Sequence, residues 1–405
     1  MGNSVSSSDE PAGAAAAPAA GAAPAAGEEE NFNNLSYWEM AKMGYQELVN
    51  AIIRPPRAEY EVEHLGPAEF EWHGRQFKRV DLELTNPRGM KLQCSHWMPA
   101  DMQDAGAPPR PCLIYLHGNS SARVEAISQI AMCFSIGLSI FAFDFSGSGK
   151  SEGDWVSLGF WERDDLATVI AHLRASGTVS TVALWGRSMG SVCALLHGHR
   201  DPSIAAMVLD GAFADLTQLA EELVDRARAH GLTVPTFVVS IAIRMIRSSV
   251  LKSADFKMED VSAVKHADSC YIPALFVAGE QDDFVAPHHS RQIHAKYAGD
   301  KNLVLVDGDH NSARPRFLYD SAAIFLQSYT AVPQAWGIPG ADAFNDGCPP
   351  WIPIRSYGLN LADLGFEIGD VDLNQMNLGM TDERQQHVQN TLHGLFNPSD
   401  RRGPR

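Results

Sequence analysis

The sequence predicts a mostly parallel, doubly wound α/β sheet that carries a helical insertion. The first observation is a series of short, continuous apolar runs, which are typical of strands buried on both faces of a parallel sheet. The second is that helical segments separate these runs, as they do in a doubly wound domain. The predicted strands cover residues 113–116, 138–143, 181–185, 205–209, 274–278 and 303–306, and the predicted helices cover 122–136, 162–174 and 189–199.

The residues before this sheet divide into three parts. Residues 1–30 are rich in alanine, glycine and proline and have almost no large apolar side chain, so we expect a disordered spacer. A helix is expected over residues 35–53, where two prolines then end it. Two apolar segments on either side of the turn Asn86-Pro87-Arg88-Gly89 suggest a hairpin. The α/β domain as a whole is expected over residues 31–333.

The connection between the runs at 205–209 and 274–278 is much longer than an ordinary αβ loop. It contains two helical patterns, at 216–230 and 237–251, and we interpret about residues 213–270 as a lid over the site. The second helix is apolar on most sides. Such a helix is normally buried, so it either packs within the lid or lines an apolar channel for an acyl chain.

Residues 334–405 form a C-terminal extension rich in proline, glycine and asparagine, which predicts a largely irregular segment. Within it, a short amphipathic helix is expected at 381–395, with Val388, Leu392 and Leu395 on one side. That helix would either dock on the domain or bind a protein partner, whose identity the sequence leaves open.

The motif Gly186-Arg187-Ser188-Met189-Gly190 lies between a predicted strand and a predicted helix. The pattern G-x-S-x-G is weak by itself, but the strand–turn–helix context places the serine at the top of the sheet. The two glycines allow the chain to turn tightly there. The start of the helix also directs the Met189 amide toward an oxyanion that develops on a substrate. The sequence therefore predicts Ser188 as a nucleophile and Met189 as an oxyanion donor.

A serine nucleophile needs a base, and the base needs a carboxylate that orients it. Asp282 follows the run at 274–278 and His310 follows the run at 303–306, so both lie beyond the carboxyl ends of strands. Ligands bind at this edge of an open α/β sheet, and Ser188 lies there too. Along the sequence the serine comes first, then the acid and then the histidine. This is the order expected when the serine lies in a strand–turn–helix motif. We predict a catalytic triad of Ser188, Asp282 and His310.

Other residues near the same edge stay open as alternatives. Asp283 differs from its neighbour Asp282 mainly in the direction of its side chain. Asp210 ends an earlier strand and either serves as the acid or is a structural carboxylate near the site. His288 and His289 follow a proline at a predicted helix start and are alternatives for the base.

The second oxyanion donor is expected from the turn His117-Gly118-Asn119-Ser120, which follows the predicted strand at 113–116. In enzymes with a serine nucleophile on such a turn, the residue after His-Gly commonly donates its amide to the oxyanion. We therefore predict Asn119 as the donor, with Ser120 as the alternative. His117 is expected to be a structural side chain beneath this turn.

These motifs resemble those of the α/β-hydrolase superfamily, and more narrowly of its serine-aminopeptidase-like branch. Residues 144–151, Asp-Phe-Ser-Gly-Ser-Gly-Lys-Ser, are similar to the superfamily's D-x-x-G-x-G-x-S turn after the fourth strand, and residues 53–60, 185–190, 282–290 and 308–311 look like a plant and protist subgroup. The resemblance covers roughly residues 35–329 and implies an α/β-hydrolase fold. The family's spacing also favours Asp282 over Asp283 as the acid. Neighbouring members include depalmitoylases and lipid esterases.

The combined prediction is a serine hydrolase that cleaves an acyl ester or thioester, on a lipid-like or acyl-protein substrate, through an acyl-enzyme. The site implies no metal and no cofactor. One alternative is a serine peptidase or small-ester hydrolase; an aminopeptidase would need Glu221, Glu222 or Asp225 of the lid to hold a free amine. The other alternative is a non-catalytic scaffold tethered to a membrane.

The composition limits the partners and the compartment. A net charge of −17 argues against a nucleic-acid binder, because phosphate contacts need a positive surface. The six cysteines contain no CxxC pair, which favours a reducing compartment. The start Met1-Gly2-Asn3-Ser4-Val5-Ser6 fits the pattern for N-myristoylation of Gly2. One such chain gives only marginal membrane binding, so we predict a cytoplasmic protein that is peripherally associated with a membrane surface.

Overall fold

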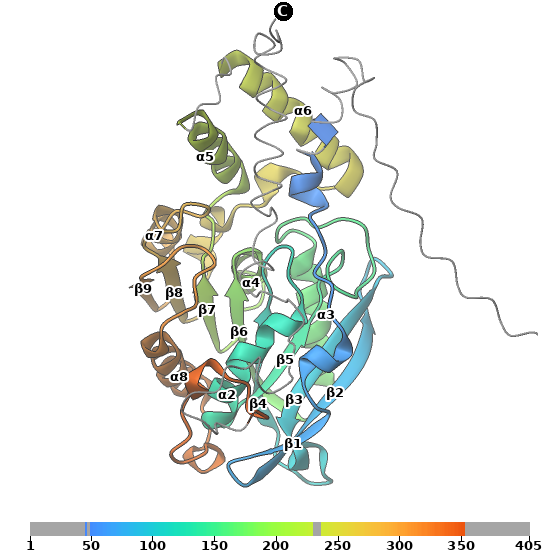
Figure 1. Cartoon of the computed structure of the whole chain (residues 1–405), viewed down its shortest axis with the longest axis vertical. Coiled ribbons are helices and arrows are strands. Elements are labelled where there is room, and N and C mark those ends of the chain that lie inside the picture. The colour runs from blue at the N-terminus through green and yellow to red at the C-terminus, as the bar shows by residue number, and fades with distance from the viewer. Residues whose placement is uncertain (1–44, 47–48, 230–235, 353–405) are drawn as a thin grey trace, which may run out of the picture.

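A computed structural model describes residues 45–46, 49–229 and 236–352. In this part of the chain a nine-stranded sheet of order β1-β2-β3-β5-β4-β6-β7-β8-β9 forms the centre of the molecule (Figure 1). Its strands are β1 (Glu69–Trp72), β2 (Arg75–Thr85), β3 (Lys91–Pro99), β4 (Arg110–Leu116), β5 (Ser139–Phe143), β6 (Val179–Arg187), β7 (Ala206–Asp210), β8 (Ala274–Gly279) and β9 (Lys301–Val306). The predictions for residues 1–30, for Gly2 and for a helix at 381–395 lie outside the described residues.

Strands β4 to β9 pair in parallel, whereas β1, β2 and β3 add an antiparallel edge. This mostly parallel sheet confirms the predicted fold class. The predicted hairpin is also present, because β2 and β3 pair around a turn in which the Gly89 amide donates to the Asn86 carbonyl at 2.9 Å. The predicted helix at 122–136 begins as the short 3-10 helix η4 (Arg123–Ala126) and continues as α2 (Ile127–Ser135). Strand β1 was not among the predicted strands.

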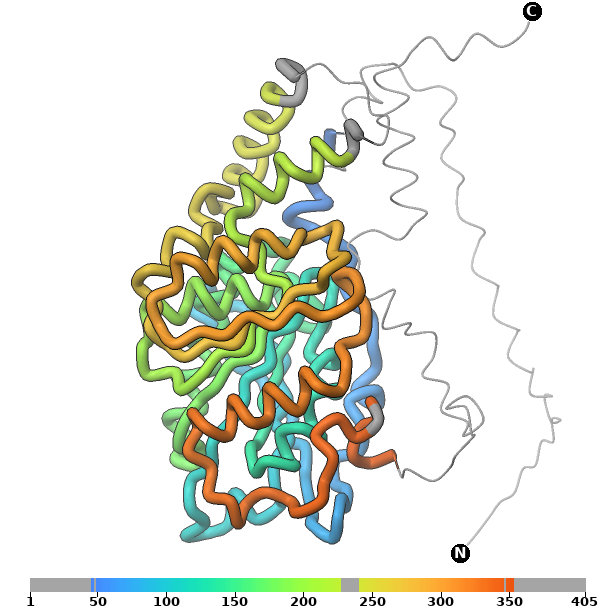
Figure 2. Tube along the Cα trace, turned by 90° about the vertical axis from the view of Figure 1, so that its left-hand side faces the viewer, coloured from blue at the N-terminus to red at the C-terminus, as the bar shows by residue number. Residues whose placement is uncertain are grey.

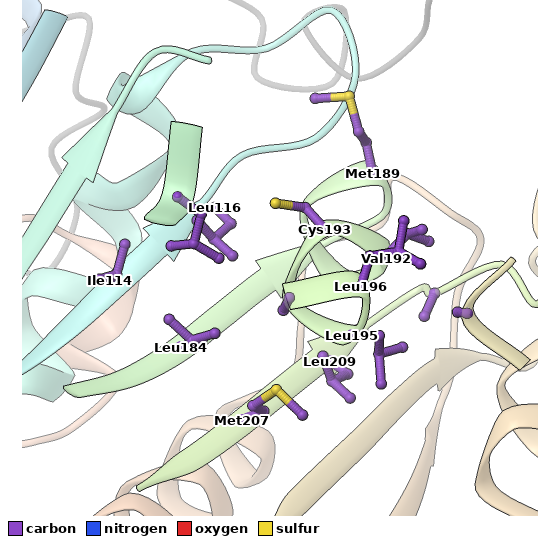
Figure 3. Close-up of a cluster of buried hydrophobic side chains, with 14 of the residues drawn as sticks. Ile114, Leu116, Leu184, Met189, Val192, Cys193, Leu195, Leu196, Met207 and Leu209 are labelled. Atoms are coloured by element: carbon purple, nitrogen blue, oxygen red, sulfur yellow. The ribbon is translucent and has the colours of Figure 1, made fainter. Parts of the chain in front are cut away.

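Helices cover both faces of the sheet and enclose two apolar cores. On one face lie α3 (Glu162–Ala175), α4 (Met189–Gly198) and α7 (His288–Lys296), and on the other lie α2 and α8 (Arg316–Thr330). Strand β4 serves both cores, since Ile114 and Leu116 point to the first and Leu113 and Tyr115 to the second. A strand that is buried on both faces needs an apolar residue at every position, which explains its continuous apolar run. Figure 3 shows part of the first core, where side chains of α4 meet those of β4, β6 and β7.

The insertion after β7 contains the two predicted helices, α5 (Leu216–Ala229) and α6 (Thr236–Ala254). Because α5 starts only a few residues beyond the carboxyl end of β7, the insertion emerges from the same edge of the sheet as Ser188. Both helices lie at one end of the molecule, away from β1 (Figures 1 and 2). Among the described helices, none combines the length and the apolar composition needed to cross a membrane.

The described part of the C-terminal extension packs on the domain. It has two short 3-10 helices, η8 (Gln334–Trp336) and η9 (Asn345–Gly347). The Arg110 guanidinium lies over the Trp336 ring at 4.7 Å, and the Trp351 ring meets Phe70 edge-on at 5.2 Å. These contacts hold the irregular segment against the end of the sheet opposite to Ser188.

Candidate active site

Ser188 occupies a sharp turn between β6 and α4. Its backbone has φ 50° and ψ −114°, which is strained for a residue with a side chain. The turn is held because the Ser188 amide donates to the Asp210 carbonyl of β7 at 2.7 Å. In addition, the Ser191 hydroxyl donates to the Gly186 and Asp210 carbonyls at 2.6 and 2.9 Å. The neighbouring strand and the first turn of α4 therefore fix the direction of the Ser188 side chain.

The two glycines of the motif are required because other parts of the backbone approach them closely. A Cβ on Gly186 would collide with the backbone of Gly190, and a Cβ on Gly190 would collide with the carbonyl of Leu116 at the end of β4. The second contact has a further consequence, because it brings the turn after β4 against the first turn of α4. The two glycines of the motif are thus needed for the close packing of β4, β6 and α4.

The structure brings the three predicted triad residues together in one hydrogen-bonded chain. The Ser188 Oγ lies 3.0 Å from His310 Nε2, and His310 Nδ1 lies 2.6 Å from Asp282 Oδ2. All three side chains are buried. With a carboxylate at Asp282, His310 donates from Nδ1, and its Nε2 is left to accept from the Ser188 hydroxyl. The arrangement has the hydrogen bonds that a general base needs to deprotonate a serine.

Asp282 is held by the loop that it begins. Its Oδ1 accepts the amides of Phe284 and Val285 at 3.0 and 2.7 Å, so only Oδ2 faces His310. The Phe284 ring also lies against the imidazole, with 5.3 Å between ring centroids. These contacts orient the side chains of both Asp282 and His310.

The alternative acids and bases do not reach this chain of hydrogen bonds. Asp283 is exposed to solvent. Asp210 is buried in a two-pronged ion pair with Arg314, at 2.9 Å from both Nε and Nη2. His288 and His289 bind the insertion helix α5, as described below. None of these four side chains contacts Ser188 or His310 in a hydrogen bond within the described chain.

The turn expected to supply the second oxyanion donor lies next to the turn that carries Ser188, because Gly190 packs against the end of β4. In the described part of the chain, neither the Asn119 amide nor the Met189 amide donates to another backbone group outside the regular elements. Both amides are therefore available to an acceptor from a ligand. Ser120, the alternative donor, has a left-handed φ of 60° and is buried.

His117 is a structural side chain, as expected. Its Nε2 accepts the Phe145 amide at 3.1 Å, which leaves the proton on Nδ1, and Nδ1 donates to the Gly118 carbonyl at 2.7 Å. Burial lowers its pKa and keeps the ring neutral. Both nitrogens are thus occupied within the turn.

An ion pair of Arg187, the residue before Ser188, connects the parts of the site. Arg187 Nη1 lies 3.0 Å from Glu125 Oε1, and Arg187 Nη2 donates to the His310 carbonyl at 2.9 Å. The other Glu125 oxygen accepts the Gly118 amide at 3.0 Å. Burial by itself would raise the pKa of Glu125, but Arg187 and the Gly118 amide together hold it below its usual value. The turn after β4, the turn at Ser188 and the loop that carries His310 are therefore all connected to one buried ion pair.

The insertion helix α5 is fastened to the loop that follows Asp282. Glu222 lies 2.9 Å from His288 Nε2 and 3.1 Å from His289 Nε2, and Arg226 donates to the Phe284 carbonyl at 3.3 Å. Hydrogen bonds from Gln218 and His288 outweigh partial burial and lower the pKa of Glu222. The insertion is thereby coupled to the loop that carries the predicted acid.

Glu222, His288 and His289 are also the set of described residues whose ligand atoms could meet at a metal ion, since these atoms lie within 4.8 Å of one another. However, the Ala214 amide donates to His289 Nδ1 at 3.3 Å, so the proton of the neutral ring is on Nε2. A metal at Nε2 would have to displace that proton. We therefore interpret the three residues as a hydrogen-bonded clamp.

The clamp leads to a prediction for the substitution Glu222→Ala. It leaves the fully buried His289 Nε2 without an acceptor, which costs about 1–3 kcal/mol, and it detaches α5 from the domain. We expect a lower unfolding temperature and faster cleavage of the insertion in limited proteolysis. Glu221→Ala is the matched control, because that side chain is 58% exposed and its ion pair with Arg247 is long, at 3.8 Å. Equal proteolysis of the two variants would contradict the clamp.

Comparison with known proteins finds a family model and relatives that are similar to this chain. Residues 107–249 match the family model described as serine aminopeptidase, S33. An uncharacterized protein of Bacillus subtilis, YqkD, is 23% identical over 238 residues, which is 58% of this chain and 74% of that protein. The lysophosphatidylserine lipase ABHD12 of Rattus norvegicus is 26% identical over 47% of this chain, but the match spans only 46% of the lipase.

The fold is also found among solved structures. The Pyrococcus furiosus esterase Pf2001 superposes with a TM-score of 0.52 at 18% sequence identity. The match covers 69% of this chain and 98% of the esterase. At this identity the superposition supports the chain fold, and the chemistry has to be argued from the residues of the site.

Proposed function

We propose that this chain, an α/β-hydrolase of the serine aminopeptidase S33 type, cleaves acyl esters or thioesters with Ser188 as the nucleophile. Its membership in this branch of the α/β-hydrolases was predicted from its motifs and is confirmed, as is the prediction of an enzyme with ester hydrolase activity. The proposal for the residues rests mainly on one observation. Ser188, His310 and Asp282 form a buried, continuous chain of hydrogen bonds.

The proposed reaction begins when Ser188 Oγ attacks the carbonyl carbon of the substrate and His310 Nε2 takes the hydroxyl proton. Asp282 stabilises the resulting imidazolium, and the amides of Asn119 and Met189 bind the oxyanion. His310 then gives its proton to the leaving oxygen or sulfur, and an acyl-Ser188 ester remains. A water molecule, deprotonated by His310, hydrolyses that ester and returns the enzyme to its starting state.

The insertion makes the aminopeptidase alternative less attractive. That alternative needs a carboxylate of the insertion that is available to a free amine. In the structure Glu222 is engaged by two histidines. The hydrogen-bonded arrangement of Ser188, His310 and Asp282 also argues against the alternative of a non-catalytic scaffold.

Further parts of the proposal concern the acyl group and the location. We propose an apolar acyl chain, an acylated Gly2 and peripheral membrane association. They are supported by the apolar composition of the insertion and by the N-terminal sequence pattern.

The proposal is tested by labelling with a fluorophosphonate, which reacts with activated serines. We expect stoichiometric labelling of the folded protein, and mass spectrometry of its peptides should place the adduct on Ser188. Protein unfolded by heat before the reaction is the control and should remain unlabelled. Absence of label on the folded protein, or a label on another serine, would contradict the assignment.

A further inference from the structure

Helix α6 of the insertion presents one continuous surface to solvent. At about 100° per residue, six of its exposed positions fall within an arc of roughly 120°. Val250 and Ala254, on the opposite side, are buried against the domain. We call this surface the α6 outer face; it consists of Ile241, Arg244, Met245, Ser248, Leu251 and Lys252.

The α6 outer face carries three large apolar side chains that are open to water. Ile241 is 56% exposed, Met245 is 51% exposed and Leu251 is 43% exposed. Single exposed apolar residues are ordinary on protein surfaces, but a group on one helix face marks an interaction surface. The helix is therefore apolar on both sides, with one side buried in the protein and the other left for a partner.

The charges on this face are all positive. Arg244 and Lys252 stand among the apolar residues, and no acidic residue belongs to the face, although the chain as a whole has a net charge of −17. Arg247, a partly exposed position at the edge of this face, pairs with two carboxylates, Glu221 at 3.8 Å and Glu259 at 3.1 Å. Salt screens the more distant charges beyond about 8 Å. An anionic partner at α6 thus meets two cations and no opposing acid on that face.

We propose that the α6 outer face docks on an anionic lipid surface. Apolar side chains mixed with lysine or arginine are the composition of helices that lie in a membrane interface. Ile241, Met245 and Leu251 would enter the boundary between headgroups and acyl chains, and the two cations would meet lipid phosphates. This inference goes beyond the reaction at Ser188 and does not depend on it. Docking would hold the insertion end of the molecule at the lipid (Figure 1).

A second copy of the chain fits the same face less well. A two-fold axis through Ser248 would pair two α6 helices in antiparallel orientation. Ser248 is midway between Arg244 and Lys252 in the sequence. In such a dimer, Arg244 of one copy would therefore lie opposite Lys252 of the other. Two such pairs of like charges disfavour a symmetric dimer.

The experiment is flotation of the full chain with lipid vesicles, after expression in bacteria that do not acylate Gly2. We expect the protein to float with vesicles of equal phosphatidylcholine and phosphatidylserine, but not with phosphatidylcholine alone, and to be released by high salt. Arg244→Glu combined with Lys252→Glu should weaken binding by at least about 30-fold. Ile241→Ser, Met245→Ser and Leu251→Ser in one protein should abolish it.

The matched control uses apolar residues that are equally exposed on another helix. Phe317 and Ile324 of α8 are 52% and 67% exposed, so Phe317→Ser with Ile324→Ser should float as the wild type does. Ser188→Ala should also float unchanged, which separates docking from catalysis. Wild-type protein that stays with the soluble fraction, or α6 variants that bind normally, would overturn the proposal. So would a wild-type dimer in sedimentation that only the α6 variants convert to monomer.

Discussion

Ser188→Ala is expected to lower the kcat of ester hydrolysis by about 10⁶-fold, by analogy with other serine hydrolases. The substitution removes the atom that attacks the substrate and leaves the remaining contacts of the site in place. Weak residual turnover is expected, because the Asn119 and Met189 amides would still polarise the carbonyl for water. The measurement is hydrolysis of a chromogenic ester under saturating conditions, with the unfolding temperature recorded for each variant.

Ser191→Ala is the control for this substitution. It removes the same kind of atom three residues later, where the hydroxyl bonds to the Gly186 and Asp210 carbonyls. We expect a lower unfolding temperature but activity within about tenfold of wild type, since the Ser188–His310 pair is untouched. An inactive Ser191→Ala protein of normal stability, beside an active Ser188→Ala protein, would refute the assignment of the nucleophile.

Much of this site was predictable because strand ends can be located from the sequence. Continuous apolar runs placed the strands, and Ser188, Asp282 and His310 each follow the carboxyl end of one. Parallel pairing of β6, β7, β8 and β9 then puts these ends at one edge. The choice of Asp282 over Asp283 depended on the spacing of the acid in the related family. The structure gives a physical reason for that choice. Only Asp282 turns inward, where it accepts the Phe284 and Val285 amides.

Other features escaped prediction because their partners are distant in the chain. The identity of the carboxylate that pairs with Arg187 is one of them, since Glu125 is 62 residues away and lies in a short 3-10 helix where a regular helix was expected. Glu222 meets His288 and His289 only because the insertion folds back over the sheet edge. Strand β1 alternates between exposed and buried residues but has only four of them, so it becomes recognisable only when paired with β2. Each of these depends on tertiary contacts that no local pattern encodes.

Asp282→Asn is expected to lower kcat by about 10⁴-fold while the fold stays intact. The reason lies in the two oxygens of the carboxylate. Oδ1 must accept the Phe284 and Val285 amides, so the new NH2 group would occupy the position of Oδ2, 2.6 Å from His310 Nδ1. Because an amide NH2 can only donate, Nδ1 would have to accept, and the proton would move to Nε2. His310 would then direct a proton, in place of a lone pair, toward Ser188.

The opposite orientation of the asparagine does not rescue the base. It would return an oxygen to His310 but turn the NH2 group against the two backbone amides, which would lose their acceptor. Asp283→Asn is the matched control, because it makes the same chemical change on the exposed neighbouring side chain, and its activity should equal that of the wild type. Fluorophosphonate labelling rates should follow the same order, since labelling also needs the base. If Asp283→Asn lost more activity than Asp282→Asn, the acid would have to be reassigned, and with it the account of how the loop after β8 orients His310.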